Sequence, residues 1–413
     1  MADPCDQELT GIRTVVTGGR VWTGDDGSLQ RVDVLVNDGV ITDIGTSLHG
    51  DAVIDVGGRA LLPGFIDCHV HVVFDGLDLV DLVSTRPSYR LFRAARALER
   101  TLAAGVTTVR DAGGADAGVR DAVRDGVLRG PRMLVAIGML SITGGHGDSQ
   151  LGCGMPLSHS DLLNTPRTIA DSPDEVRQVV RQLLAAGADV IKVATSGGVL
   201  SENDSPRHPQ YQPQELAALM AEVGDAEVRV MAHAQAREGI RRAVEAGVAS
   251  IEHGIYLDRE LADLMAERGT FLVPTLVAPH AVIAAAESGA SIPAHQVAKA
   301  REVLKEHKTA FRHALDAGVR IAMGTDCGVH PHGRNLDELG LMARAGMPPV
   351  QVLQAATSEA ADLLGLRGQV GRIAVGQAAD LVAIDGDPFD FDGYADRVAL
   401  VVQAGAVVSD RRT

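Results

Sequence analysis

The sequence predicts an α/β fold in which a (β/α)8 TIM barrel carries a small β-sandwich domain built from both chain ends. The two ends share short β-branched runs broken by Gly and Asp, whereas the middle alternates apolar strand-like runs with helical segments rich in Ala, Leu and Arg. Eight such alternations over about 300 residues are typical of a barrel. An open doubly wound sheet permits the same alternation, but no GxGxxG motif follows the first strand of the middle region.

The sandwich domain is expected from residues 1–60 together with residues 367–413. The N-terminal part contains the runs TVVTGGRVWTG, VDVLVNDGVITDIG and AVIDVGGRALLPG. The same pattern of short β-branched runs broken by Gly and Asp occurs near the C-terminus, in GRIAVGQAADLVAIDGDPF and ALVVQAGAVVSD. Each run reads as a strand ended by a turn. Two separate end domains would each be small and bury little surface. We therefore expect the ends to pair in one composite domain beside a barrel of residues 61–366.

The barrel strands are expected at eight apolar runs: residues 60–67, 106–113, 132–138, 188–195, 227–234, 248–254, 270–275 and 319–326. Helices are expected between them, at residues 88–105, 172–187, 212–224, 237–247, 258–269 and 307–318. Several of these segments end in Gly, the usual residue after a helix. Ser172 stands three residues before Glu175, with Pro between them, which predicts a capped helix start.

Composition and charge exclude several classes of protein. The 413 residues include 38 Lys+Arg and 54 Asp+Glu, so the formal net charge of −16 argues against nucleic acid or an anionic membrane as partner. No run of about 18 apolar residues is present that could span a bilayer. The start, MADPCDQELT, lacks a signal-peptide pattern, and the four cysteines have no disulfide-framework spacing. We expect a cytoplasmic enzyme acting on a small molecule, and a homo-oligomer is compatible with this composition.

Ligand-type side chains stand at the ends of the predicted barrel strands, where active sites of such barrels lie. The first strand runs into a His-x-His motif, whose period of two points both imidazoles to one side, as capture of a metal ion requires. A single histidine at a strand end is more often a structural residue than a ligand. Several such positions together are hard to explain by packing: His69, His71, Lys192, His233, His253 and Asp326.

Lys192 is one of only four lysines in the chain, and the other three lie together in the charged segment AKAREVLKEHK. It interrupts the apolar run DVIKVAT, where an ammonium group is costly to desolvate. A buried lysine loses its proton readily, and its neutral amine can react with carbon dioxide to give an anionic carbamate. The two oxygens of that group can bridge two cations. The alternative is a lysine paired with a carboxylate in the barrel interior.

These residues predict a binuclear metal centre. His69, His71 and Asp326 would hold one ion, His233 and His253 the second, and carboxylated Lys192 would join them. Zinc is the ion that this ligand set favours, with Mn²⁺, Co²⁺ and Fe²⁺ left open by residue type. Two ions about 3.5–4 Å apart share a hydroxide that attacks a polarised carbonyl. Asp326 would take the proton from that hydroxide and pass it to the leaving group.

The segment PGFIDCHVH (63–71) resembles the PGxIDxHxH signature of the amidohydrolase superfamily. VIKVATSGG, AHA, IEHG and GTDCG resemble its remaining metal-site segments in the same order, so the resemblance covers nearly the whole chain. TTVRDAGG and TGGHGD are similar to the branch of imidazolonepropionase-like proteins and zinc-dependent Xaa-Pro dipeptidases. That resemblance implies a carboxylated lysine, two metal ions, and cleavage of amide or related bonds.

Three substrate-binding residues are also expected. His146 of TGGHGD matches a histidine that the dipeptidase branch uses near the scissile group, which implies polarisation of the substrate. Gln235 stands where those dipeptidases tend to have Tyr, and glutamine is shorter and does not ionise. His330 follows Asp326 on the loop after the last strand, where an ordinary solvated loop histidine is an equal alternative. Residues 203–212 form a loop that could cover the site.

The leading hypothesis is a binuclear, metal-dependent amidohydrolase that uses a metal-bridging hydroxide to hydrolyse a carbon–nitrogen bond of a small amide, peptide or carbamate. The same site could serve an esterase or organophosphate hydrolase, because such a hydroxide attacks several electrophiles. A third hypothesis, from outside the enzymes, is a non-catalytic scaffold that kept only the barrel. The intact set of six ligand-type residues argues against the scaffold, which has no need of them.

Overall fold

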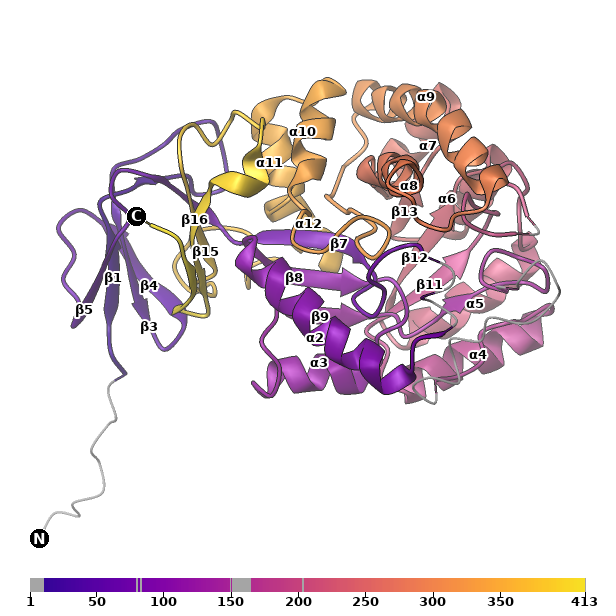
Figure 1. Ribbon diagram of the computed structural model, residues 1–413, viewed down its shortest axis with the longest axis horizontal. Coiled ribbons are helices and arrows are strands. Elements are labelled where there is room, and N and C mark those ends of the chain that lie inside the picture. The colour runs from indigo at the N-terminus through magenta and orange to yellow at the C-terminus, as the bar shows by residue number, and fades with distance from the viewer. Residues whose placement is uncertain are drawn as a thin grey trace, which may run out of the picture.

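The computed structural model describes residues 11–78, 81, 84–148, 150, 165–202 and 204–412. Figure 1 shows two β-sheets at one end of the molecule, beside a larger body in which helices surround a bundle of strands. Cys5 and Cys153 lie outside the described residues, whereas Cys68 and Cys327 are buried free thiols. In the described part of the chain, we find no helix with the length and apolar character needed to cross a membrane.

Parallel strands form the centre of the larger body. One sheet contains β7 (Phe65–Val70), β8 (Val106–Asp111) and β9 (Arg132–Val135). A second sheet contains β10 (Met139–Leu140), β11 (Val190–Ala194), β12 (Arg229–Ala234), β13 (Ser250–His253) and β14 (Phe271–Val273), in that order. Every pairing within these sheets is parallel, so the strands end at a common edge. The strands are almost wholly buried, as their apolar runs predict.

The helices confirm the predicted alternation. They are α2 (Pro87–Ala103), α3 (Ala117–Arg124), α4 (Pro173–Ala185), α5 (Pro213–Asp225), α6 (Arg237–Ala246), α7 (Arg259–Arg268), α8 (Val277–Glu287), α9 (Ala294–Ala317), α10 (Asp337–Arg344), α11 (Pro349–Ala355) and α12 (Ser358–Leu364). The Ser172 hydroxyl accepts a hydrogen bond from the Glu175 amide (3.3 Å), which confirms the predicted cap. Gly247, following α6, adopts the left-handed conformation that ends a helix.

The first predicted strand is two strands in different sheets. Residues 60–63 form β6, which pairs antiparallel with a strand near the C-terminus, and β7 begins at Phe65. The break falls at Gly64, where a Cβ atom would lie 2.2 Å from the Thr107 Oγ1 atom. Only glycine fits this contact between the chain and β8. The expectation of one continuous strand over residues 60–67 is therefore wrong.

The last predicted strand, residues 319–326, is not a regular strand. Ile321 forms one isolated parallel bridge with Leu272 of β14. Further along, the Cys68 amide of β7 donates to the Met323 carbonyl oxygen at 2.8 Å. Asp326 has a φ of 59°, which no strand residue adopts. This segment therefore lies between β14 and β7 but turns too sharply to form a ladder.

Both chain ends contribute to the two remaining sheets. One has the order β17-β16-β15-β6-β2 and the other the order β4-β3-β1-β5. Their strands are β1 (Thr14–Thr17), β2 (Arg20–Val21), β3 (Asp33–Asn37), β4 (Val40–Gly45), β5 (Ala52–Asp55), β15 (Leu381–Ile384), β16 (Val398–Gln403) and β17 (Ala406–Asp410). The antiparallel pairing of β6 with β15 joins the two ends as the sequence predicts. Val34, Val36 and Leu400 contribute to an apolar core between them.

Candidate metal centre and active site

Three ligand-type side chains converge where β7 ends. His69 is the fifth residue of β7, and His71 follows the strand, so the period of two turns both rings toward the same side. The nearest ring nitrogens of His69 and His71 lie 3.6 and 3.3 Å from the Asp326 Oδ1 atom. One ligand atom from each of the three residues lies within 4.8 Å of the others. This spacing is compact enough for one cation.

Asp326 reaches this position through a buried network around Asp67. The Asp67 carboxylate accepts hydrogen bonds from the Thr325 hydroxyl (2.6 Å) and the Asn335 side-chain amide (2.8 Å). The Asp326 amide donates to the His69 carbonyl oxygen at 2.7 Å. These contacts hold Asp326 in its left-handed conformation, which turns the side chain toward the histidines. Burial raises the pKa of Asp67 itself to about 6, although its hydrogen bonds act in the opposite direction.

Asp326 carries a negative charge in the metal-free protein. Burial by itself would raise the pKa of Asp326, but the hydrogen bond to His71 and the nearby histidine rings outweigh it, and the pKa falls well below its usual value. Burial opposes a charge on His71, yet the Asp326 carboxylate raises the pKa of His71 overall. An ionised carboxylate beside imidazoles is the form that binds cations.

A second pair of histidines lies beside the first. His233 on β12 and His253 on β13 have ring centroids 4.7 Å apart, and the His253 ring is 5.1 Å from that of His69. One nitrogen of each ring has a hydrogen-bond partner. His233 Nε2 lies 3.1 Å from the Gly197 carbonyl oxygen, and His253 Nδ1 lies 2.7 Å from the Thr275 hydroxyl. Burial lowers the pKa of His253 to about 3 and that of His233 far below its usual value. Both rings are therefore neutral, and each keeps one nitrogen for a cation.

Lys192 lies on β11 between these histidines. Its side chain is almost fully buried, and its Nζ atom lies 3.4 Å from His69 Nε2. Burial lowers the pKa of Lys192 to about 8. Within the described residues, no carboxylate oxygen lies within 4.0 Å of Nζ, so the alternative of a paired structural lysine finds no partner. An unpaired buried amine is the group that carboxylation requires.

The donor set fits metal ions. Nδ1 of His69 lies 2.7 Å from the Glu252 carboxylate, and Nδ1 of His71 lies 2.7 Å from the Gly113 carbonyl oxygen. Both Nδ1 atoms therefore carry the hydrogen, and both Nε2 atoms are left as lone-pair donors near Asp326. Neutral imidazoles with a carboxylate suit zinc and similar divalent ions.

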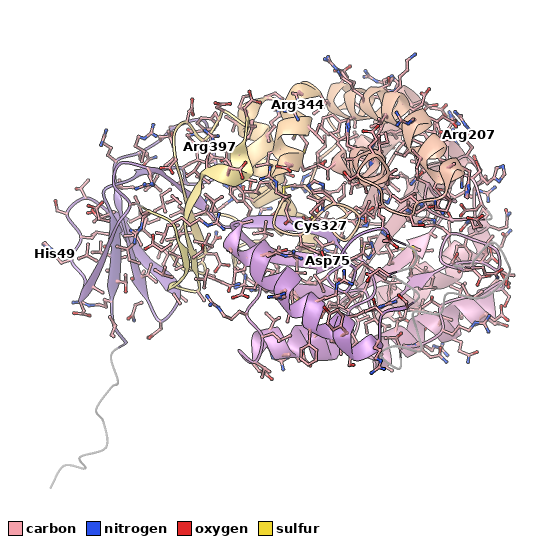
Figure 2. All side chains as sticks on the ribbon, viewed as in Figure 1. His49, Asp75, Arg207, Cys327, Arg344 and Arg397 are labelled. Carbon is pink, nitrogen blue, oxygen red and sulfur yellow. The ribbon has the colours of Figure 1, made fainter. Side chains whose placement is uncertain are left out.

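A cavity of about 700 Å³ opens over these residues. Its lining includes His69, His71, Lys192, His146, His233, Gln235, His253 and Asp326. Apolar side chains form much of the remaining wall, among them Phe74, Ile137, Met139, Leu200, Ile255 and Val303. In Figure 2, the neighbour of Asp326, Cys327, lies in the interior of the larger body, whereas Arg207 lies on the outer surface. The predicted ligand set thus forms the polar floor of an apolar pocket.

His146 lies on the loop after β10 and lines this cavity beside His233. Its ring stacks on that of His233, with centroids 4.0 Å apart and an interplanar angle of 19°. His146 Nδ1 lies 2.8 Å from the Ser201 hydroxyl, and Ser201 in turn donates to the Asp204 carboxylate. Nδ1 therefore carries the hydrogen, and Nε2 has no hydrogen-bond partner in the described part of the chain. The free nitrogen is available to a ligand.

Gln235 and His330 differ in placement. Gln235 lines the cavity, is 5% exposed, and its Oε1 atom has no hydrogen-bond partner among the described residues. His330 is not among the described residues of the lining. Its Nε2 atom lies 3.1 Å from the Arg334 carbonyl oxygen and 3.5 Å from the Asp337 carboxylate, because the loop after Asp326 turns back on itself. The structure therefore does not bring His330 to the site.

Among the described residues of the predicted covering loop, 204–212, none lines the cavity. Residue 203 is outside the described residues, and Leu200, just before the predicted loop, lines the pocket. Lys299 of α9 holds this region, because its Nζ atom donates to the carbonyl oxygens of Ser201 (2.9 Å) and Asp204 (2.7 Å). Arg207 pairs with Glu302 of the same helix at 2.9 Å. The loop is thus fastened to α9.

Sequence reasoning missed several residues around the site. Ser201 and Asp204 lie on a loop, and nothing in their spacing predicts a contact with His146. Arg167 lines the cavity from a segment without a regular pattern. Arg110 and Glu252, in contrast, interrupt the buried strands VTTVRD and SIEH as Lys192 interrupts VIKVA. The same signal, a charge inside an apolar strand, could have found both.

Comparison with known proteins identifies the family. The family model described as the amidohydrolase family matches residues 60–408. The chain belongs to the amidohydrolase family. An ochratoxinase from Aspergillus niger is 32% identical over 404 residues, which cover 91% of this chain and 82% of that protein. An imidazolonepropionase from Salinispora arenicola is 26% identical and matches over 95% of both chains.

Solved structures agree with this assignment. The crystal structure of an Xaa-Pro dipeptidase with methionine bound in its active site superposes with a TM-score of 0.88 at 32% identity, over 96% of this chain and 99% of that one. The predicted resemblance is therefore confirmed, as is a hydrolase acting on carbon–nitrogen bonds. Family membership also implies a TIM barrel with an additional domain and the general use of metal ions.

Proposed function

We propose that this amidohydrolase hydrolyses a carbon–nitrogen bond of a small amide, peptide or carbamate with the help of two divalent metal ions. The observation that carries the proposal is the convergence of His69, His71 and Asp326 within 4.8 Å, on the floor of an apolar cavity. The adjoining His233, His253 and Lys192 supply donors for a second ion.

We assign one ion to His69, His71 and Asp326 and the other to His233 and His253. Lys192, carboxylated by carbon dioxide, would join both, and zinc suits the donors best. When bound, the ions would acidify a water molecule and polarise the scissile carbonyl group. The burial of Lys192 and its pKa of about 8 support the neutral amine that carboxylation needs.

The remaining steps belong to residues of this chain. Asp326 is ionised and lies at the centre of the cluster, so it accepts the proton of the attacking water and delivers it to the leaving nitrogen. His146 lines the cavity beside His233, with Nε2 free. To donate a hydrogen bond to the carbonyl oxygen it must be protonated: the Asp204 carboxylate, 3.8 Å from Nδ1, favours that charge, whereas burial lowers the pKa of His146.

The cavity also suggests the shape of the substrate. Its walls are largely apolar, and Arg167 and Lys192 are the basic residues among the described lining. Arg167 is exposed, and no acidic partner for it occurs among the described residues. A guanidinium pairs well with a carboxylate. We propose a substrate that presents an apolar group to the walls and a carboxylate to Arg167.

We also propose that the parallel strands close into a (β/α)8 barrel. Support comes from residues 320–327, which hydrogen-bond to Leu272 of β14 on one side and to Cys68 of β7 on the other. The same proposal assigns residues 61–366 to the barrel and residues 1–60 with 367–413 to one composite β-sandwich domain. The pairing of β6 with β15 supports the union of the two ends in one domain, and it extends that domain to Pro63.

A substrate screen with metal analysis tests the function. Purified protein loaded with zinc is assayed against N-acyl amino acids, dipeptides, carbamates and lactams, with carboxylate esters and phosphotriesters as the competing class. Hydrolysis of amides with close to two ions per chain supports the proposal. Well below one ion per chain, with no hydrolysis after metal addition, indicates a scaffold, and a preference for esters indicates the alternative enzyme.

A further inference from the structure

A fully buried carboxylate lies directly behind one of the candidate metal ligands. The Glu252 Oε2 atom is 2.7 Å from His69 Nδ1, and the side chains are 0% and 2% exposed. On the other side of the ring, His69 Nε2 faces the Asp326 carboxylate and the Lys192 amine at 3.6 and 3.4 Å. The imidazole thus stands between Glu252 and the proposed metal position.

Arg110 and Ser250 prevent Glu252 from turning toward that position itself. The Arg110 Nη2 atom donates to Oε1 of Glu252 at 2.9 Å, and the Ser250 hydroxyl donates to the same oxygen. Arg110 is anchored in turn, because its Nε atom donates to the Cys68 carbonyl oxygen at 2.6 Å. Both oxygens of the Glu252 carboxylate therefore have partners: Oε1 accepts from Arg110 and Ser250, and Oε2 faces His69.

We propose that Glu252 is a positioning residue that fixes the tautomer and the direction of His69. A carboxylate that forms an ion pair with Arg110 accepts hydrogen bonds, so His69 Nδ1 carries the hydrogen and Nε2 presents its lone pair to a metal ion. The Arg110 guanidinium, 2.9 Å from Oε1, forms an ion pair with this buried carboxylate. A carboxylate behind a ligating imidazole also makes the imidazole a stronger donor.

The other candidate histidine ligands have neutral partners. The ring nitrogens of His71 and His233 face the carbonyl oxygens of Gly113 and Gly197, and that of His253 faces the Thr275 hydroxyl. Of these four rings, His69 alone is backed by a charged carboxylate. The ion held by His69, His71 and Asp326 is therefore the one that depends on Glu252. This part of the inference rests on the proposed function.

The first test measures metal affinity. Metal-free wild type, Glu252→Gln and Glu338→Gln are titrated with zinc in competition with a chelator. Glu338 is a matched control, because it is also fully buried but accepts hydrogen bonds from the backbone amides of Leu276 and Val277. We expect Glu252→Gln to bind zinc about 10- to 100-fold more weakly, and Glu338→Gln to match wild type. Equal affinity in all three proteins overturns the proposal.

A second measurement is made on the wild type, and a variant serves only to assign the signal. In metal-free wild type with ¹⁵N-labelled histidine, NMR reports which ring nitrogen of His69 carries the hydrogen, and His69→Gln assigns the signal. The expected result is the hydrogen on Nδ1, and a hydrogen on Nε2 overturns the proposal. A wild type that binds no metal but shows the hydrogen on Nδ1 would refute the proposed function and leave the positioning by Glu252 intact.

Discussion

The two sides of the cavity are built differently. The floor consists of side chains at strand ends, such as His69, His233 and His253, whose backbones belong to parallel strands and whose rings are held by buried partners. A second part of the wall comes from a loop: His146 lines the cavity beside His233, and its position is held by Ser201, Asp204 and Lys299 of α9. The floor can assemble a metal centre, whereas the loop side can vary with the substrate without disturbing it.

This difference separates what is common to a family from what is particular to one member. Strand ends are fixed by the fold, which this chain shares with relatives that match nearly its whole length. Loop residues are constrained only by local contacts, so they set which amide is cleaved. Changes on the floor should therefore abolish the reaction, and changes on the loop side should redirect it.

The largest effect is expected from a change on the floor. Asp326→Asn keeps the shape of the side chain but removes the proton acceptor, so kcat should fall by about 100-fold or more. Asp148→Asn is a matched control, because Asp148 also lines the cavity but accepts a hydrogen bond from the Gly144 amide. Steady-state kinetics across neutral pH check both variants. Near-normal turnover of Asp326→Asn would show that the proton is carried elsewhere.

A smaller loss is expected on the loop side. His146→Ala should lower kcat/KM by about 10- to 100-fold, because the proposed role of the residue is to polarise the scissile group without holding a metal ion. Metal content should stay at the wild-type value. His330→Ala serves as control, since its ring contacts Arg334 and Asp337 and does not line the cavity. Equal losses in the two variants would contradict the role of His146.

Selectivity should depend on Gln235. Its buried Oε1 atom has no partner among the described residues, and a prolyl amide nitrogen has no hydrogen to donate to it. Leaving such an acceptor unpaired costs about 1–3 kcal/mol, so we expect weak or absent cleavage of Xaa-Pro dipeptides compared with secondary amides. Kinetics with Leu-Pro and Leu-Ala compare them directly. A kcat/KM for Leu-Pro above about 10⁴ M⁻¹s⁻¹ would refute this expectation.

The last of these predictions concerns stability instead of catalysis, at His307, which also lines the cavity. Burial lowers the pKa of His307 to about 4, and its Nε2 atom lies 3.0 Å from the His253 carbonyl oxygen. Below about pH 6.5 the unfolded chain binds a proton at this histidine and the folded chain does not, so stability is lost as pH falls toward 4. This group accounts for a loss of about 3 kcal/mol at most.

The variant His307→Gln isolates that contribution. Its nitrogen can still donate to the His253 carbonyl oxygen, but it does not titrate. Chemical unfolding at pH 7 and pH 4.5 gives the free energy of unfolding of both proteins. The value for the wild type should fall relative to that for the variant at the lower pH. A constant difference between the two proteins at both values would show that His307 does not remain neutral in the fold.

The contrast between floor and loops also explains what the sequence could predict. Strand-end ligands such as His69 and His71 follow from a period of two, and Lys192 from a charge inside an apolar run. The irregular path of residues 319–326 was not predictable, because it depends on the left-handed turn at Asp326 and on Asp67 far away in the chain. Nor could sequence show that Asp204 reaches His146, or that His330 turns toward Asp337, since such contacts depend on loop geometry.

The central claim is that Lys192 is carboxylated and joins two metal ions, and metal content per folded chain tests it most directly. Wild type, Lys192→Ala and the exposed control Lys305→Ala are compared, with a high-resolution density map at Lys192 of the wild type. We expect about two ions and a carbamate in wild type, loss of metal and activity together in Lys192→Ala, and partial restoration by acetate or propionate. An unmodified amine at full metal occupancy and full activity would contradict the account.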